Sequence, residues 1–147
     1  MSNIRKKVTI LIAEDDDDDY FLTEKAFKKS KVNNNLVRVT NGIELLDYLL
    51  NRNNFSDKNI YPHPTLILLD LNMPLMDGRT ALAEIKKNPA LSHIPVTILT
   101  TSKEEEDIVS SYKTGASSFL RKPVNFPDFV DVLMEFQKYW FEIVELP

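Results

Sequence analysis

Val8-Thr-Ile-Leu-Ile-Ala-Glu-Asp15 is a run of apolar and β-branched residues that ends abruptly in two acids. A later stretch, Thr65-Leu-Ile-Leu-Leu-Asp70, has the same character and also ends in an acid. Both runs are nearly continuous in apolar residues, whereas a half-exposed strand alternates apolar and polar side chains. Such runs are typical of strands that helices cover on both faces of a parallel sheet.

Three further runs, Leu36–Val39, Val96–Leu99 and Ser118–Arg121, predict the remaining strands, and the last is polar enough for an edge. Each of the five runs is followed by apolar residues at helical spacing. In chain order these are Leu22, Ala26 and Phe27; Ile43, Leu46, Leu49 and Leu50; Ala81, Leu82 and Ile85; Ile108, Val109 and Tyr112; and Phe129, Val132, Leu133, Phe136 and Trp140. This alternation of strand and helix predicts a doubly wound α/β domain. The polar stretch Asn51–Pro64 is expected to be a long, weakly structured loop.

The composition fits one domain and excludes several classes of function. A chain of 147 residues, 43% of them hydrophobic, has room for one core and not for two. Acids outnumber basic residues by 22 to 18, but six of the acids lie together at Glu14–Asp19, and no general basic field for nucleic acid remains. The absence of cysteine excludes disulfides and thiolate metal sites. Since no run resembles a signal peptide or membrane span, we expect a cytoplasmic protein that binds neither nucleic acid nor membrane.

The predicted functional site lies where the strands end, because binding sites of open parallel sheets lie outside the carboxyl ends of the strands. The first strand ends in Glu14-Asp15, the third in Asp70, the fourth in Thr100-Thr101 and the fifth in Lys122-Pro123. Three carboxylates with few counter-charges suit a hard divalent cation such as Mg²⁺. We expect Asp15 and Asp70 to be direct ligands, and Glu14 to bind the metal or a metal-bound water.

Asp70 is also suited to act as a nucleophile toward phosphorus, because a carboxylate beside a metal can form an aspartyl phosphate. The Thr100 hydroxyl and the Lys122 ammonium would then bind phosphoryl oxygens. Taken singly, Asp70, Thr100 and Lys122 can each be explained as a strand end or a surface charge. Asp17–Asp19 are better explained as the capped first turn of a helix than as part of the site. We prefer the joint interpretation, because four strand ends would otherwise supply this chemistry by accident.

Other sequence features point to no chemistry. His63 and His93 lie close to prolines, with no acidic partner or ligand spacing, and are expected to be ordinary surface residues. The chain has only three glycines, which leaves neither a Walker loop nor a dinucleotide fingerprint.

Four motifs together resemble the response-regulator receiver domain of two-component signalling, from Val8 to about Tyr139. They are Ile10-Leu-Ile-Ala-Glu-Asp15; Leu68-Leu-Asp-Leu-Asn-Met-Pro-Leu-Met-Asp-Gly78; Leu99-Thr-Thr-Ser102; and Gly115-Ala116 followed by Phe119 and Lys122-Pro123. The resemblance implies a flavodoxin-like receiver fold with strand order 2-1-3-4-5. It also implies a single receiver domain over residues 1–147, with a core at about 8–139, a C-terminal helix extension at 126–147 and no output domain.

The resemblance assigns roles around the predicted metal. It implies Glu14 and Asp15 as the acid pair that holds Mg²⁺, and Asp70 as the phosphoacceptor. Asn72 would be a metal ligand through its backbone carbonyl.

The resemblance also assigns roles around the phosphoryl group. Thr100 and Lys122 would hold it, and Thr100 would move together with Phe119 as a conformational switch. Phe119 lacks the hydroxyl of the tyrosine that is commoner in the family, so a phenolic hydrogen bond is excluded. By analogy with the family, the Lys122–Pro123 bond is expected to be cis.

The implied function is a phosphoacceptor signalling protein and not an enzyme, with a histidine kinase as phosphodonor and an unidentified protein as target. The chain is most similar to small stand-alone regulators partnered with bacterial phytochrome kinases, although relatives serve other hybrid kinases. One alternative is a haloacid-dehalogenase-type phosphatase, which needs an Asp as general acid where this chain has Asn72. Another is a flavodoxin-like electron carrier, in which the carboxylates of Glu14–Asp19 would repel the flavin phosphate.

A homodimer is expected from a second apolar stripe in the last predicted helix. Val130, Met134, Gln137, Phe141 and Val144 recur at intervals of four, three, four and three, which is the spacing of a helix-pairing seam. Two alternatives stay open: neighbouring loops cover this stripe, or the helix ends near Trp140. Resemblance to the phytochrome-linked regulators favours the dimer.

Overall fold

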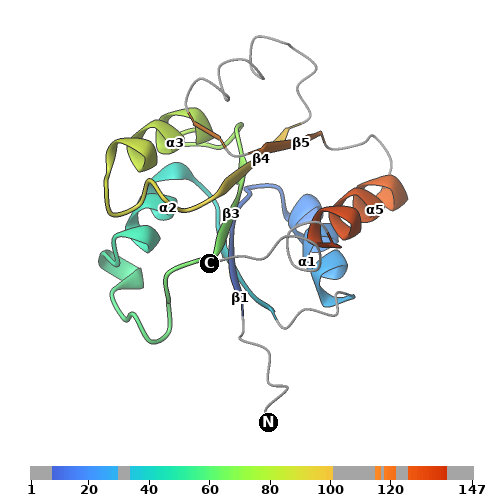
Figure 1. The fold of residues 1–147 in the computed structure, drawn as a ribbon, viewed down its shortest axis with the longest axis horizontal. Coiled ribbons are helices and arrows are strands. Elements are labelled where there is room, and N and C mark those ends of the chain that lie inside the picture. Colours follow the sequence, from blue (N-terminus) through green and yellow to red (C-terminus); the bar gives the residue numbers. More distant parts are fainter. Residues whose placement is uncertain (1–7, 30–33, 101–114, 117, 122–125, 139–147) are drawn as a thin grey trace.

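The computed structural model describes residues 8–29, 34–100, 115–116, 118–121 and 126–138 (Figure 1). Its centre is a parallel sheet of five strands in the order β2-β1-β3-β4-β5. The strands are β1 (Val8–Ala13), β2 (Asn34–Val39), β3 (Leu66–Asp70), β4 (Val96–Thr100) and β5 (Ser118–Arg121). The predicted fold class and strand order are confirmed.

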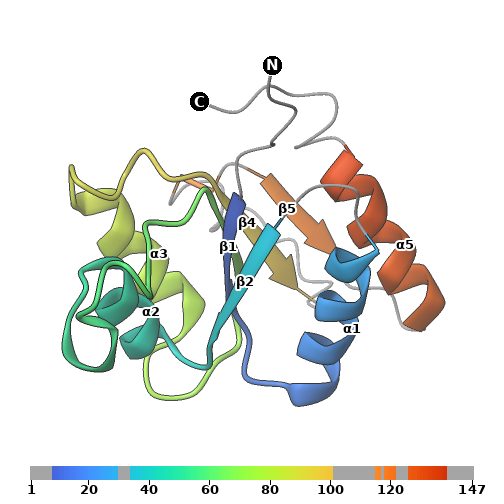
Figure 2. The same cartoon turned by 90° about the horizontal axis from the view of Figure 1, so that it is seen from below.

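Helices cover both faces of the sheet. The described α-helices are α1 (Asp17–Lys28), α2 (Gly42–Leu49), α3 (Gly78–Lys87) and α5 (Phe126–Gln137). Figure 2 shows α1 and α5 packed together on one face and α2 and α3 on the other. The helix predicted around Ile108, Val109 and Tyr112 lies outside the described residues. None of the described helices is long and apolar enough to cross a membrane.

The two faces of the central strands explain their continuous apolar sequence. Side chains of a strand point alternately to opposite faces. Ile67 and Leu69 of β3 belong to the cluster that includes α2 and α3, whereas Leu66 and Leu68 pack with Phe27 of α1. All four of these β3 side chains have no exposed surface, so the side chains on both faces of the strand must be apolar.

The stretch Asn51–Pro64 differs from the weakly structured loop that was predicted. It contains a 3-10 helix at Asn53–Phe55, and Asn51 and Asn53 take left-handed backbone conformations that asparagine tolerates well. The side-chain amide of Asn51 donates hydrogen bonds to the carbonyls of Phe55 (3.0 Å) and Tyr61 (3.2 Å). The predicted long loop before β3 is confirmed, but it is more ordered than expected, because polar composition does not reveal that asparagine side chains satisfy the loop's own backbone.

Three aromatic rings anchor the same loop to the core. Tyr48 of α2, Phe55 and Tyr61 lie with ring centroids 5.1 to 5.8 Å apart in tilted and edge-on arrangements. The Tyr48 hydroxyl donates a hydrogen bond of 2.7 Å to the carbonyl of Pro62. This Tyr48 cluster joins α2 to the segment that leads into β3.

Helix α5 buries most of the predicted face: Phe129, Leu133 and Phe136 are in the core, Val132 is half-buried, and Trp140 lies outside the described residues. Gln137 is buried as well and donates to the carbonyl of Ala26 in α1 (3.3 Å), so it does not continue an outward-facing stripe. Val130 and Met134 are half-buried and pack against the cluster that α1 and α5 share. Phe141, Val144 and the rest of the predicted helix extension after residue 138 lie outside the described residues.

Candidate metal and phosphoacceptor site

Three acids meet at the carboxyl end of the sheet. Carboxylate oxygens of Glu14, Asp15 and Asp70 all lie within 4.8 Å of one another. Glu14 and Asp15 follow β1, and Asp70 is the last residue of β3, the strand paired with β1. Adjacent parallel strands that end together therefore bring side chains 55 or more positions apart in the sequence into one site.

Backbone hydrogen bonds hold Glu14 at the end of β1. Its N–H donates to the carbonyl of Val39 (3.0 Å), which extends the β1–β2 ladder by one residue. The Asp16 N–H donates to Glu14 Oε2 (3.3 Å), and the Glu14 residue is fully buried. A buried carboxylate beside two others is costly unless a cation or hydrogen bonds compensate it.

Asp70 is 7% exposed, and the turn after β3 is built closely around it. The Asn72 N–H donates to Asp70 Oδ1 (3.1 Å), and the Gly78 N–H donates to the carbonyl of Leu71 (2.9 Å). A Cβ atom at Gly78 would lie 2.4 Å from the Asp70 carbonyl oxygen, closer than packed atoms can approach. Glycine at position 78 thus lets the start of α3 pack directly against the backbone of the acid.

Asp16 caps the first helix. Its side chain accepts a hydrogen bond from the Asp19 N–H (2.9 Å), and Asp17, Asp18 and Asp19 form the first turn of α1. Acids in this position are stabilised by the unpaired N–H groups and the helix dipole. The interpretation of Asp17–Asp19 as a helix start agrees with the structure, with the cap itself at Asp16.

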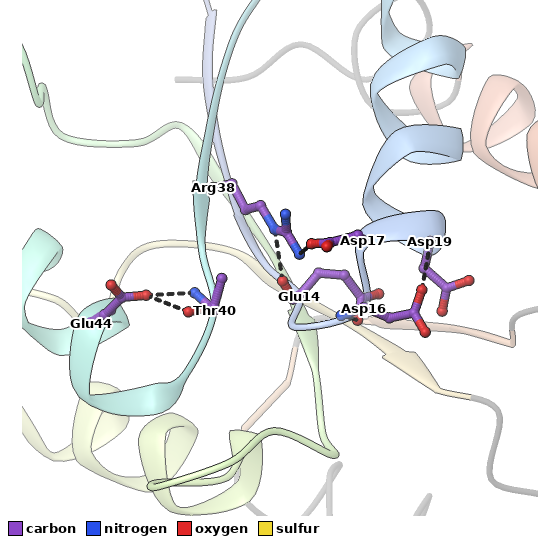
Figure 3. Close-up of polar contacts among 7 residues, drawn as sticks. All are labelled: Glu14, Asp16, Asp17, Asp19, Arg38, Thr40 and Glu44. Carbon is purple, nitrogen blue, oxygen red and sulfur yellow. Dashed lines mark hydrogen bonds and ion pairs between the residues drawn. The ribbon is translucent and has the colours of Figure 1, made fainter.

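Arg38 of β2 lies beside this acidic turn (Figure 3). Its Nε donates to the carbonyl of Glu14 (2.9 Å), and its Nη2 forms an ion pair with Asp17 (2.8 Å). The guanidinium also lies 4.7 Å from the centre of the Tyr20 ring. Burial, followed by the charge of Glu24, raises the pKa of Tyr20, and the charge of Arg38 opposes this shift.

The start of α2 is fixed by a variant of the capping box, in which Glu44 accepts from Thr40, the residue before the N-cap Asn41. The Asn41 side chain accepts from the Glu44 N–H (2.8 Å), and Glu44 Oε1 accepts from the N–H (2.8 Å) and the hydroxyl (2.7 Å) of Thr40 (Figure 3). The sequence Thr40-Asn-Gly-Ile-Glu44 carried this signature and could have predicted the cap. Arg38 carried no such signal, because its partners lie on other elements.

The donor set fits a hard divalent cation. All three groups offer oxygen ligands, which Mg²⁺ prefers, and together they carry the charge that a divalent ion would neutralise. The backbone of Asn72 follows Asp70 closely through their hydrogen bond, although the role of its carbonyl as a ligand stays a prediction.

The other predicted residues are placed only in part. The backbone of Thr100 ends β4, and that of Phe119 lies in β5, next to Ile98 of β4 in the register. Lys122 and Pro123, including the predicted cis bond, lie outside the described residues. The roles of Thr100, Phe119 and Lys122 stay predictions.

His63 and His93 are exposed, as predicted for surface residues. Their rings nevertheless contact each other, edge to face, with centroids 5.6 Å apart. Burial, followed by the charge of His93, lowers the pKa of His63. Both residues precede strands at the amino end of the sheet, so they lie away from the three acids.

Comparison with known proteins settles the family. Residues 10–134 match the response regulator receiver domain. The chain belongs to this family. The three acids that the fold brings together, Glu14, Asp15 and Asp70, are the residues that stand in the receiver motifs of the sequence.

Similar proteins match along nearly the whole chain. Response regulator Rcp1 of Synechocystis sp. is 38% identical over 138 residues, which cover 94% of this chain and 92% of Rcp1. The crystal structure of the Mn²⁺-bound form of Rcp1 has a TM-score of 0.88 at 37% identity, covering 95% of this chain and 99% of that one.

Two further structures come from regulators of phytochromes. The phosphorylated cyanobacterial phytochrome response regulator RcpA has a TM-score of 0.91 at 34% identity, covering 97% of this chain and 99% of its own. The bacteriophytochrome response regulator RtBRR has a TM-score of 0.75 at 36% identity, covering 97% of this chain and 85% of its own. The predicted similarity to phytochrome-linked regulators is therefore confirmed.

Proposed function

We propose that this protein accepts a phosphoryl group on Asp70, from a phosphohistidine of a sensor kinase, in a Mg²⁺-dependent reaction. The observation that carries the proposal is the meeting of Glu14, Asp15 and Asp70 within 4.8 Å in a chain of the receiver family. The phosphorylated protein would then signal by a conformational change to a protein partner.

In the proposed reaction, a carboxylate oxygen of Asp70 forms the new bond to phosphorus while the bond between phosphorus and the histidine nitrogen breaks. The leaving imidazole keeps the electron pair of that bond and takes up a proton. The Asn72 N–H, which donates to Asp70 Oδ1, orients the carboxylate before attack. Glu14, Asp15, Asp70 and the carbonyl of Asn72 would hold Mg²⁺. The bound ion would neutralise charge on the phosphoryl oxygens. Thr100 and Lys122 would bind the remaining phosphoryl oxygens, and Phe119 would move with Thr100.

The kinase is proposed to be of the phytochrome or hybrid type. Support comes from the resemblance to RcpA and RtBRR, which are described as phytochrome and bacteriophytochrome response regulators. We place the exchange in the cytoplasm and expect no nucleic-acid or membrane partner. One receiver domain spanning the whole chain is sufficient for this function.

The phosphatase alternative is not favoured. A haloacid-dehalogenase-type enzyme would use a general acid two residues after the nucleophile, and Asn72 cannot donate a proton to a leaving group. The match of residues 10–134 to the receiver family points the same way. We therefore propose turnover limited to the protein's own phosphorylation and dephosphorylation.

The test is the intact mass of the protein after incubation with Mg²⁺ and acetyl phosphate. The wild type should gain one phosphoryl group, and Asp70→Asn should gain none. Asp77→Asn is the matched control, because Asp77 lies in the same turn but only caps α3, and asparagine caps helices equally well. A phosphoryl gain by Asp70→Asn at the wild-type rate would contradict the proposal, as would a gain that chelation of Mg²⁺ leaves unchanged.

We also propose a homodimer through the C-terminal helix, with Val130, Met134, Phe141 and Val144 at the interface. Val130 and Met134 are only half-buried in a single copy, which leaves apolar surface for a second copy to cover. Light scattering over a dilution series should show the dimer, and Met134→Glu should dissociate it by burying like charges. A monomer mass for the wild type at high micromolar concentration would refute it.

A further inference from the structure

Three contacts converge on the side chain of Arg38 at the edge of the acidic site. The guanidinium donates to the carbonyl of Glu14, pairs with Asp17 and lies over the ring of Tyr20. The Arg38 side chain is 21% exposed, whereas that of Asp17 is 89% exposed. Arg38 is thus a largely buried cation whose contacts all lie on or beside the turn that joins β1 to α1.

The residues that Arg38 contacts include one predicted metal ligand, Glu14, and lie on either side of another, Asp15. Glu14 is the first residue after β1, and Asp17 is the first residue of α1. Asp15 lies between them, and it is exposed. The Glu14 N–H is already bound to Val39, the residue after Arg38. One side chain of β2 therefore ties both ends of the segment 14–17 to the sheet, as Figure 3 shows for Glu14 and Asp17.

We propose that Arg38 is a positioning residue for the divalent cation: it holds the segment 14–17 in the conformation that brings Glu14 and Asp15 to Asp70. The inference rests on the proposed function, since it presumes that these acids bind Mg²⁺. Groups that orient metal ligands without touching the metal commonly change metal affinity by about 10-fold or more when they are removed.

The sign of the effect separates positioning from simple charge. Arg38 is a cation bound to the backbone of Glu14, one of the three acids, so through-space electrostatics alone predict that its removal strengthens Mg²⁺ binding. Positioning predicts weaker binding, because the freed segment 14–17 must be ordered again each time the cation binds. Arg38→Lys adds a second distinction, since lysine keeps the charge but lacks the planar fork that reaches Glu14 and Asp17 together.

The experiment is a calorimetric titration of the full chain with Mg²⁺ alone. Arg38→Ala should bind Mg²⁺ about tenfold more weakly than the wild type, and Arg38→Lys should also bind more weakly. Arg52→Ala is the matched control: Arg52, which follows α2, is also paired with an aspartate, Asp47 of α2 (3.2 Å), but it contacts none of the three acids in the described structure. Its Mg²⁺ affinity should equal that of the wild type. Equal or tighter binding by Arg38→Ala would overturn the inference.

A second pair of variants tests the positioning role of Arg38 if Arg38→Ala does not fold. Asp17→Asn and Asp18→Asn each remove one exposed acid from the first turn of α1, but only Asp17 is bound by Arg38. Both variants lose one exposed negative charge near the cation, so they are titrated at high salt, which screens exposed charges. Asp17→Asn should then weaken Mg²⁺ binding more than Asp18→Asn, and equal effects would overturn the inference. The wild-type titration keeps the two proposals apart. Absence of Mg²⁺ binding there contradicts the proposed function itself, whereas normal wild-type binding with no effect of these variants contradicts only the role of Arg38.

Discussion

The two ends of the sheet are built in opposite ways. At the carboxyl end, three like-charged groups are gathered with their oxygens within 4.8 Å of one another. At the amino end, the Tyr48 cluster packs three aromatic rings, and the Tyr48 hydroxyl and the Asn51 amide bind the carbonyls of the loop. The three acids at the carboxyl end need a cation to offset their repulsion, whereas the Tyr48 hydroxyl and the Asn51 amide at the amino end already have hydrogen-bond partners.

This difference indicates that the amino end of the sheet contributes mainly to stability and the carboxyl end mainly to function. Like charges in a partly buried site cost free energy of folding unless a cation is bound. Buried aromatic rings with bonded hydroxyls supply free energy of folding and need no ligand. Variants at the amino end should therefore lower stability and leave phosphorylation intact. Variants of the three acids should impair phosphorylation and, without a cation, should not lower stability.

The largest stability effect is expected from Tyr48→Ala. Tyr48 is 1% exposed and contacts both other rings of its cluster. Removal of a buried aromatic ring costs about 3–5 kcal/mol of unfolding free energy, because a cavity remains. Urea denaturation measures this loss, and the folded fraction should still be phosphorylated as in the wild type. A normal stability, or a folded variant that cannot be phosphorylated, would contradict the separation of the two ends.

Asp15→Ala should have the next largest effect, and the larger part of that effect should require Mg²⁺. At a Mg²⁺ concentration 100 times the dissociation constant, binding stabilises the wild type by about 2.7 kcal/mol through mass action. The variant should lose most of this gain, and its stability without Mg²⁺ should rise because repulsion with Glu14 and Asp70 is relieved. Thermal unfolding with and without Mg²⁺ is the measurement. A full Mg²⁺ response in Asp15→Ala would exclude Asp15 as a ligand.

A smaller effect is expected from Tyr48→Phe, which removes only the hydroxyl and its bond to Pro62, at a cost of about 1 kcal/mol at neutral pH. Burial, followed by the charge of Tyr61, raises the pKa of Tyr48 from 10.0 to about 12. The unfolded tyrosine loses its proton first, so the stability that Tyr48 contributes is complete below pH 10 and is lost as the pH rises toward 12. Denaturation at pH 9 and pH 11 should therefore show the difference between wild type and variant shrinking. A constant difference would contradict the shifted pKa.

The smallest effect is expected from His63→Gln. The pKa of His63 lies below its usual 6.5, first because of burial and then because of the charge of His93. The unfolded chain therefore takes up a proton first, and wild-type stability should fall as the pH drops below 6.5. The wild type should lose more stability than His63→Gln between pH 7 and pH 5.5, a range above that in which most carboxylates titrate. Identical pH dependence of the two proteins would contradict the pKa shift.

Some of the molecule was predictable because neighbouring residues carry the information. The doubly buried β3 follows from Leu66-Ile-Leu-Leu69, since a short run of successive apolar side chains between turn-forming segments is typical of strands that helices cover on both faces. The acid site followed from a topological rule that places the carboxyl ends of parallel strands together. The loop Asn51–Pro64 was predicted, but its order was not, because that order depends on Tyr48, which belongs to another element, and on left-handed asparagines that composition alone does not mark.

The sequence by itself determined the strand–helix alternation, the residues at the strand ends and membership in the receiver family, because periodicity and short motifs are local properties of a chain. Only the tertiary structure decided which side chains touch across the sheet. It placed Arg38 on the carbonyl of Glu14, 24 residues away, and Gln137 on the carbonyl of Ala26. These contacts depend on the register between strands and on helix packing, and no local pattern in the sequence encodes either of them.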